Sequence, residues 1–242
     1  MRLPRAYTTE PLVPGGELEL DARTSTHLCR VLRLRAGDTV VLFNGDGWDY
    51  VGELIRASRE AAVIQVREQC PAVPESPLRV TLVQAISRGE RMDHTLQKCT
   101  ELGASAFRPV FTERVEVRLD AERAARRMHH WQGVIRSACE QCGRTVLPIL
   151  HPPVELWTWL AAEPDGQRLM LDADAAQALS MLDAPATGLE LLVGPEGGLS
   201  PAERERLAAH GVQAVGLGPR TLRTETAGAA ALAVLQARHG DL

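Results

Sequence analysis

The chain has 242 residues, of which 45% are hydrophobic and 24% charged, and its formal net charge is −4 at pH 7. This balance is typical of a folded globular protein and excludes a disordered chain, while no apolar run approaches the about 18 residues of a membrane-spanning helix. No apolar leader follows the N-terminus and the five cysteines are an odd number, so we expect reduced thiols and a cytoplasmic protein.

The first part of the chain is rich in strand patterns. We expect strands at 40–43, 48–55 and 61–66, and the turn 44–47 between the first two reads Asn-Gly-Asp-Gly, a strong hairpin signal. Before them, apolar residues within 25–34 recur at helical spacing. The sequence therefore predicts a small β-barrel or sandwich with one helical segment.

Three prolines then fall close together, at Pro71, Pro74 and Pro77. Proline removes a backbone donor and fixes φ, so this density is incompatible with a central strand or a helix. We interpret the segment as a linker. It divides the chain into a first domain of residues 1–73 and a second domain of residues 74–242.

Beyond the linker, strand and helix patterns alternate. We expect strands at 78–86, 106–111, 146–150, 169–171, 189–193 and 212–217, and helices at 91–102, 120–142, 154–161, 201 to about 211, and 224–237. This alternation predicts an α/β domain with a mainly parallel sheet that helices cover on both faces.

Charge is unevenly distributed along this second part. Residues 78–144 carry 12 basic and 8 acidic side chains, whereas residues 145–242 carry 6 basic and 12 acidic ones. A basic segment in an acidic chain favours a local anion-binding face. The alternative is a solvated helix face of mixed charge, and charge alone does not decide between them.

The segment Gly194-Pro195-Glu196-Gly197-Gly198 joins an apolar strand to a helix that Ser200 is expected to cap. Ligands of open α/β sheets bind at the carboxyl ends of strands, and glycines allow the main chain to approach them closely. The segment lacks both the dinucleotide fingerprint and the phosphate-binding P-loop pattern. The alternative interpretation is a plain tight turn, although Pro and Glu among three glycines exceed what a turn requires.

A second such junction is Leu217-Gly218-Pro219-Arg220-Thr221-Leu222-Arg223-Thr224-Glu225-Thr226. Arg220 and Arg223 are suited to hold an anion or an oxygen that gains charge in a transition state. Thr224 or Thr226 is a candidate helix cap, with Glu225 favoured in the first turn. Capping leaves the two arginines unexplained, because cations are unfavourable near a helix N-terminus unless they have partners.

Other motifs are weaker. Cys139 and Cys142 have the spacing of half a metal site, but no second pair exists, and we expect both to be packed without a metal. Arg88-Gly89-Glu90 ends the first strand of the second domain and is expected to face the ligand. There is no G-x-S-x-G elbow, which argues against a serine hydrolase.

Taken in order, these segments resemble the RsmE family, the 16S rRNA (uracil-N3) methyltransferases of the SPOUT superfamily. The resemblance covers essentially the whole chain. The segments that carry it are 1–5, 27–33 with Gly37-Asp38, 87–90, 97–103, 139–144, 194–198 and 217–226.

The resemblance implies a PUA-like, RNA-binding β-barrel followed by a SPOUT domain with a deep trefoil knot. It implies S-adenosylmethionine as the cofactor and a homodimer as the working form, without a metal or a membrane. The substrate it implies is 16S rRNA of the small ribosomal subunit, methylated at N3 of the uridine at position 1498 of standard numbering.

Residue roles follow by position from the same resemblance. The cofactor-binding residues are expected to be Leu171, Gly194, Pro195, Glu196, Gly197, Gly198, Leu217, Gly218, Arg220 and Leu222. The loop after Leu171 has no fixed pattern. Catalysis is expected to involve Arg223, Glu225 and Arg220, and RNA phosphates are expected to meet Arg5, Arg30, Arg33, Arg88 and Arg144.

As a mechanism, an arginine would stabilise the charge that develops on the carbonyl oxygens flanking N3. Glu225 is the candidate general base, or it orients one of the arginines. Two other functions remain open at this point: an α/β enzyme that uses another nucleotide cofactor, and an RNA-binding protein without catalytic activity.

Overall fold

The computed structural model describes residues 3–116 and 120–242, so Met1 and Arg2 of the first motif lie outside the described residues. The chain divides into two compact units. The first comprises residues 1–75 together with 139–147, and the second comprises 76–138 and 148–242. Residues 139–147, which are distant in sequence from the rest of the first unit, were not expected there.

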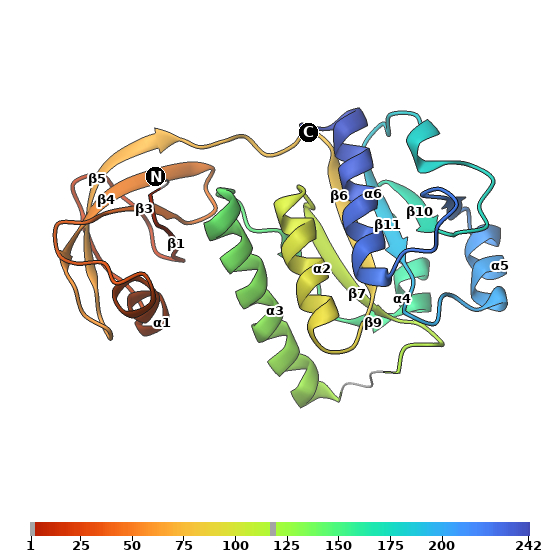
Figure 1. Ribbon diagram of the computed structural model, residues 1–242, viewed down its shortest axis with the longest axis horizontal. Helices are drawn as coiled ribbons and strands as arrows, with labels where there is room; N and C mark the ends of the chain where they lie inside the picture. The colour runs from red at the N-terminus through yellow and green to blue at the C-terminus, as the bar shows by residue number, and fades with distance from the viewer. Residues whose placement is uncertain (1–2, 117–119) are drawn as a thin grey trace. The chain divides into compact units, whose positions relative to one another are not determined.

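The first unit is built on one five-stranded sheet in the order β1-β3-β4-β5-β2 (Figure 1). Its elements are β1 (Arg5–Tyr7), β2 (Glu17–Glu19), α1 (Ala22–Thr26), the π-helical turn η1 (His27–Val31), β3 (Thr39–Phe43), β4 (Trp48–Arg56) and β5 (Val63–Pro71). Among the described strands of this unit, only β1 and β3 pair in parallel. Apolar side chains from alternate strand positions, among them Val40, Leu42 and Ile64, form its core.

Two expectations for this unit are wrong. The third strand does not stop at 66 but continues to Pro71, which pairs with Trp48. Proline is tolerated there because it is the last residue of the strand. The helical segment is not a single helix over 25–34. It starts earlier, at Ala22, where the carboxylate of Asp21 caps α1 by accepting from Thr24 N at 2.9 Å. It then widens into η1, with Leu32 N donating to His27 O.

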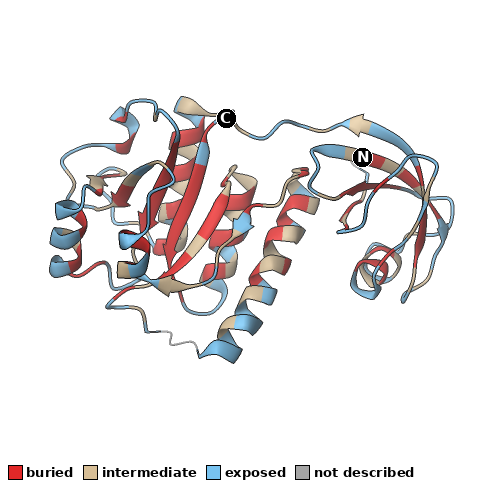
Figure 2. Ribbon diagram, turned by 180° about the vertical axis from the view of Figure 1, so that it is seen from behind, coloured by how far each residue is buried: buried red, intermediate tan, exposed pale blue. Residues whose placement is uncertain are grey.

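The second unit contains a sheet in the order β12-β10-β11-β6-β7-β8, with β9 also paired to β7, and every one of these pairings is parallel. The strands are β6 (Arg79–Ala85), β7 (Ala106–Phe111), β8 (Ile149–Leu150), β9 (Val154–Glu155), β10 (Gln167–Leu171), β11 (Gly188–Val193) and β12 (Gln213–Val215). The central strands are buried along almost their whole length (Figure 2).

Helices cover both faces of this sheet. They are α2 (Glu90–Glu101), α3 (Ala121–Cys142), α4 (Leu156–Ala161), α5 (Pro201–Ala209) and α6 (Thr224–His239), with a 3-10 turn η2 (Leu179–Met181). On one face, α6 packs against α2 and approaches β6 closely, since a Cβ on Gly228 would lie 3.4 Å from Leu82. On the other face, Val83 and Leu192 share a core with α4 and α5.

Prolines explain two differences from the expected elements. The strand expected at 146–150 is reduced to β8, because Pro148 has no N–H to donate to a neighbouring strand. The helix expected from 154 starts at Leu156, and the two residues before it form β9 instead. Pro152 and Pro153 precede them and favour extended backbone.

A buried ion pair joins β10 and β11 and contacts α4. Glu190 is 2% exposed, and its Oε2 accepts from Arg168 Nε at 2.6 Å and from Trp159 Nε1 at 3.2 Å. Arg168 also donates to the carbonyl oxygens of Leu160, Trp159 and Ala162, at 2.8, 3.0 and 2.9 Å. Burial is tolerated because every charge finds partners.

Replacing Glu190 by alanine would leave the Arg168 guanidinium buried without its counterion. We expect this substitution to lower the free energy of unfolding by about 3–5 kcal/mol, measured by urea denaturation with tryptophan fluorescence. Asp165→Ala is the matched control, because its ion pair with Arg79 is exposed on both sides and contributes little. Equal stability of the Glu190→Ala variant and the wild type would contradict this role.

Candidate active site

One cavity of about 670 Å³ lies at the carboxyl ends of β10, β11 and β12, which are neighbours in the sheet. Three loops form its wall, and each leaves one of these strands. The lining residues are Leu171, Asp172, Ala173, Asp174, Val193, Gly194, Pro195, Glu196, Gly197, Gly198, Leu199, Arg204, Val215, Leu217, Gly218, Arg220, Thr221, Leu222, Arg223, Thr224, Glu225 and Ala227. This is where open α/β sheets bind ligands.

All ten residues expected to bind the cofactor line this cavity, and so do the three expected to be catalytic. The loop after Leu171 contributes Asp172, Ala173 and Asp174 to the wall. Arg204 of α5 also lines the cavity and was not expected to. The structure thus brings together segments that are about twenty residues apart in sequence.

A chain of buried hydrogen bonds joins two of the loops. The hydroxyl of Thr224 donates to the carbonyl oxygen of Gly194 at 2.7 Å and accepts from Gln84 Nε2 at 3.0 Å. Gln84 is fully buried and Thr224 is 6% exposed. The start of α6 is therefore fastened to β6 on one side and to the Gly194 loop on the other.

This use of Thr224 corrects the expectation that it, or Thr226, caps α6. The N-cap position is Arg223, and its side chain makes no capping hydrogen bond. The Thr224 hydroxyl is already committed to Gly194. Backbone bonds from Thr226 N and Ala227 N to Arg223 O close the first turn instead.

The Gly194 loop has the tight geometry that its glycines predict. Gly198 has a φ of 66°, a backbone conformation that residues other than glycine rarely adopt. Its N–H donates to Pro195 O at 2.9 Å. The expected capping box is present, with Ser200 and Glu203 exchanging hydrogen bonds. Glu203 also accepts from Glu113 N at 2.8 Å, which anchors the start of α5.

Arg204 fixes the loop after Leu171. Its Nη1 lies 3.3 Å from carboxylate oxygens of both Asp172 and Asp174. The hydrogen bond and the charge of Asp172 raise the pKa of Arg204. The sequence offers no local signal for this contact, because the partners are thirty residues apart.

A second residue missed by the sequence analysis is Arg91, in the first turn of α2. Its Nη1 donates to Glu196 Oε1 at 2.8 Å, and its Nε lies 4.0 Å from Glu225 Oε1. Glu196 also accepts from Arg88 N at 3.4 Å. Although burial opposes its ionisation, the hydrogen bonds from Arg91 and from backbone N–H groups hold the pKa of Glu196 below its usual range.

The chemically important groups at the cavity are one carboxylate and two guanidinium groups. The side chain of Glu225 is 17% exposed, and its Oε2 is buried with no hydrogen-bond partner in the part of the chain that the structure describes. Arg220 and Arg223 are exposed. They form no ion pair with any of the described residues, and so both are available to a ligand.

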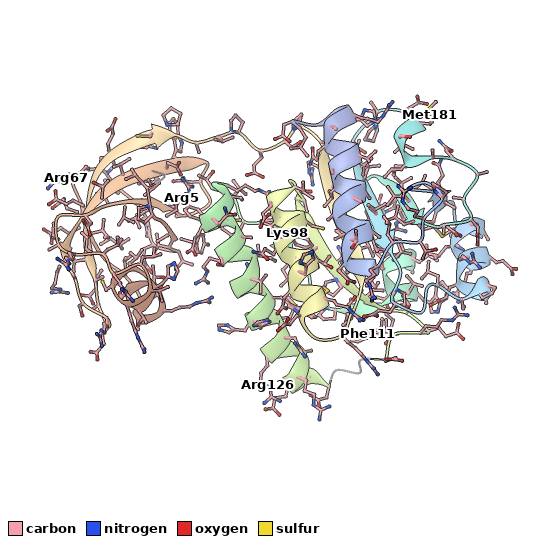
Figure 3. All side chains as sticks on the ribbon, in the orientation of Figure 1. Arg5, Arg67, Lys98, Phe111, Arg126 and Met181 are labelled. Carbon is pink, nitrogen blue, oxygen red and sulfur yellow. The ribbon has the colours of Figure 1, made fainter. Side chains whose placement is uncertain are left out.

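The five arginines expected to contact RNA differ in their surroundings. Arg30 and Arg33 are exposed at the end of η1, and Arg33 has a φ of 59°. Arg5, labelled in Figure 3, is 8% exposed and donates twice to Asp49, at 2.7 and 2.8 Å.

The remaining two also have carboxylate partners. Arg144 pairs with Glu75 and is largely buried, while its carbonyl oxygen accepts from Arg5 at 3.4 Å. Arg88 is exposed and pairs with Glu116. Arg5 and Arg144 thus have a structural role within the first unit. Of the five arginines, Arg30 and Arg33 are the two without an ion pair among residues 3–116 and 120–242.

The two cysteines singled out in the sequence are not joined in a disulfide. Cys139 is buried, its Sγ lies 3.9 Å from Val146 O, and burial raises its pKa to about 12. Among the described residues, no three His, Cys, Asp or Glu side chains gather as a metal site would require. No helix within residues 3–116 and 120–242 is long and apolar enough to cross a membrane.

Known families match both units. Residues 74–236 match the RNA methyltransferase domain family, and residues 20–67 match the RNA methyltransferase PUA domain family. The ribosomal RNA small subunit methyltransferase E of Buchnera aphidicola (Schizaphis graminum) is 30% identical over 100% of this chain and 98% of its own length.

Two solved structures are closely similar. A putative methyltransferase of Legionella pneumophila, in complex with the cofactor SAM, is 38% identical with a TM-score of 0.97 over 100% of both chains. The ribosomal RNA small subunit methyltransferase E of Neisseria gonorrhoeae, bound to S-adenosylmethionine, is 39% identical with a TM-score of 0.94 over 99% of both chains.

These similarities confirm the predicted fold class, an α/β SPOUT trefoil-knot domain preceded by a small PUA-like β-barrel. They extend over the whole length of the chain, include both units, and lead in sequence and in structure to the same group of enzymes. The chain belongs to the RsmE family of RNA methyltransferases.

Proposed function

We propose that this protein transfers the methyl group of S-adenosylmethionine to N3 of a uridine in 16S rRNA, at position 1498 of standard numbering. The observation that carries the proposal is the cavity in which a Gly-rich wall, the carboxylate of Glu225 and the guanidinium groups of Arg220 and Arg223 meet. It lies in a chain that matches named rRNA methyltransferases from end to end.

The cavity suits S-adenosylmethionine in size and in lining. About 670 Å³ is within the range of small-molecule sites. The backbone groups of the Gly194 and Gly218 loops are accessible to polar atoms of the cofactor, and Leu217 and Leu222 supply apolar surface for the adenine. When bound, the cofactor supplies an activated methyl group, so the enzyme has to position the base and remove its proton.

Glu225 is the group that accepts the N3 proton. Its Oε2 is buried at the cavity without a hydrogen-bond partner among the described residues, and so it is free to accept one. Loss of the imide proton places negative charge on the two flanking carbonyl oxygens. Arg220 and Arg223 stabilise that charge, and their exposure leaves them free to reach the base.

We assign RNA binding to residues 1–73 and the chemistry to residues 74–242. The partner is 16S rRNA in the small ribosomal subunit, and the enzyme works in the cytoplasm as a homodimer. Two features support the assignment of RNA binding and of the rRNA partner. The barrel presents Arg30 and Arg33 at its surface, and the related enzymes are named for small-subunit rRNA.

The reaction is tested with small subunits purified from cells that lack this protein. We expect the wild-type enzyme to transfer labelled methyl from S-adenosylmethionine, and mass spectrometry to identify a single N3-methyluridine. Glu225→Gln should lower kcat at least about 100-fold, as loss of a general base does. Arg223→Ala should lower kcat as well, whereas Arg238→Ala, at the exposed far end of α6, is the matched control.

Methylation of another nucleoside would overturn the substrate assignment. Full kcat in both Glu225→Gln and Arg223→Ala would overturn the residue roles. S-adenosylmethionine binding without transfer would refute the assigned substrate, and the absence of both would favour an RNA-binding protein without catalytic activity.

The RNA-binding role of the barrel is tested by charge reversal. Arg30→Glu and Arg33→Glu should each weaken binding to the 16S rRNA fragment and reduce the slope of log K against log salt by about 1, since phosphate contacts release counterions. Arg67→Glu is the control, because Arg67 is also exposed on the barrel but pairs with Glu53 (Figure 3). An unchanged slope in both variants would remove these arginines from the interface.

A further inference from the structure

Arg91 is placed where three separate segments meet behind the cavity wall. It stands in the first turn of α2, which packs against α6. Its guanidinium group contacts Glu196 of the loop after β11 at 2.8 Å and approaches Glu225 of α6 to 4.0 Å. One cation therefore serves two carboxylates that are distant in sequence from it and from each other.

A cation is unfavourable at this position of a helix, because the N-terminus carries partial positive charge. The first turn of α2 also contains Glu90 and Asp93, which the helix dipole favours. Arg91 is compensated mainly by Glu196, whose hydrogen bond raises the pKa of Arg91 further, with a smaller contribution from Glu225. The contact with the two carboxylates is thus what stabilises the arginine.

The two carboxylates are held differently. Glu196 accepts both from Arg91 and from Arg88 N, so it is fixed by two donors. Glu225 has only the longer, 4.0 Å approach of its Oε1 to Arg91, while its Oε2 is buried with no hydrogen-bond partner in the described part of the chain. One oxygen of Glu225 is thereby oriented, and the other remains available to a ligand in the cavity.

Other charged groups also line the cavity near Glu225. Arg220 and Arg223 precede its helix, and Glu196 belongs to the Gly194 loop. Among the described residues, Arg91 is the cation that lies within ion-pair distance of Glu225. Arg91 is therefore the residue that can fix the direction of this carboxylate.

We propose that Arg91 is a positioning residue for the methyl transfer: anchored by Glu196, it orients the Glu225 carboxylate so that its unpartnered oxygen can accept the N3 proton of the uridine. This inference rests on the proposed function. It assigns to the Gly194 loop a second role besides cofactor binding, since Glu196 holds the residue that prepares the general base.

A purely structural role of Arg91 predicts a different outcome. If Arg91 only anchored the cofactor loop through Glu196, its loss would weaken S-adenosylmethionine binding and leave kcat unchanged at saturation. If Arg91 positions Glu225, its loss should lower kcat and leave cofactor binding nearly intact. The two roles are therefore separated by measuring the cofactor Kd and kcat independently.

The experiment compares Arg91→Gln, Arg91→Lys and the control Arg79→Gln, whose exposed ion pair with Asp165 lies in the same unit. The Kd of S-adenosylmethionine is measured by calorimetry, and kcat is measured on small subunits at saturating cofactor. We expect Arg91→Gln to lower kcat at least about tenfold with a cofactor Kd within about threefold of wild type. Arg91→Lys should have a higher rate than Arg91→Gln, because lysine keeps the positive charge but lacks the several N–H donors of the guanidinium group.

The split between kcat and the cofactor Kd is a readout that a purely structural role would not move. Arg79→Gln should leave both quantities unchanged.

Unchanged kcat in Arg91→Gln would overturn the inference, as would a defect confined to the cofactor Kd. Stoichiometric cofactor binding by the variant establishes that it is folded. Absence of transfer by the wild-type enzyme is a separate result: it would refute the proposed function, and this inference with it.

Discussion

The hydrogen-bonded chain from Gln84 through Thr224 to Gly194 is the interaction on which the site depends. Gln84 is the penultimate residue of β6, Thr224 begins α6, and Gly194 directly follows the strand β11. Gln84 and Thr224 are buried, where an unmade hydrogen bond is costly. Because α6 also carries Glu225, the same contact that shapes the Gly194 loop sets the position of the proposed base.

The parallel sheet supplies the second constraint. Neighbouring parallel strands place their carboxyl ends at one edge, so the loops after β10, β11 and β12 meet although they are distant in sequence. Two arginines hold the loops of this wall through ion pairs. Arg204 holds the loop after β10 through Asp172, and Arg91 connects Glu196 with Glu225. The three loops thus form the cavity wall, and ion pairs between arginines and carboxylates hold these loops in place.

Much of the fold and of the cavity wall could be predicted, because the sequence patterns that determine them are local. Apolar runs that end in glycine mark β11 and its loop, and the capping box at Ser200 marks the start of α5. The fastening contacts could not be predicted, because Arg91 and Arg204 have partners far along the chain. Thr224 shows the limit clearly: its local pattern indicates a helix cap, but tertiary packing gives its hydroxyl to Gly194. A trefoil knot likewise leaves no trace in periodicity and came only from the family resemblance.

The most direct test of this account is the Kd of S-adenosylmethionine for Thr224→Val and Thr224→Ser. Valine keeps the shape of threonine and removes the hydroxyl that joins Gln84 to Gly194, whereas serine keeps that hydroxyl. The account predicts binding weaker by about tenfold for the valine variant, the value of one buried hydrogen bond, and near wild-type binding for the serine variant. Equal affinity of the valine variant and the wild-type enzyme would contradict it.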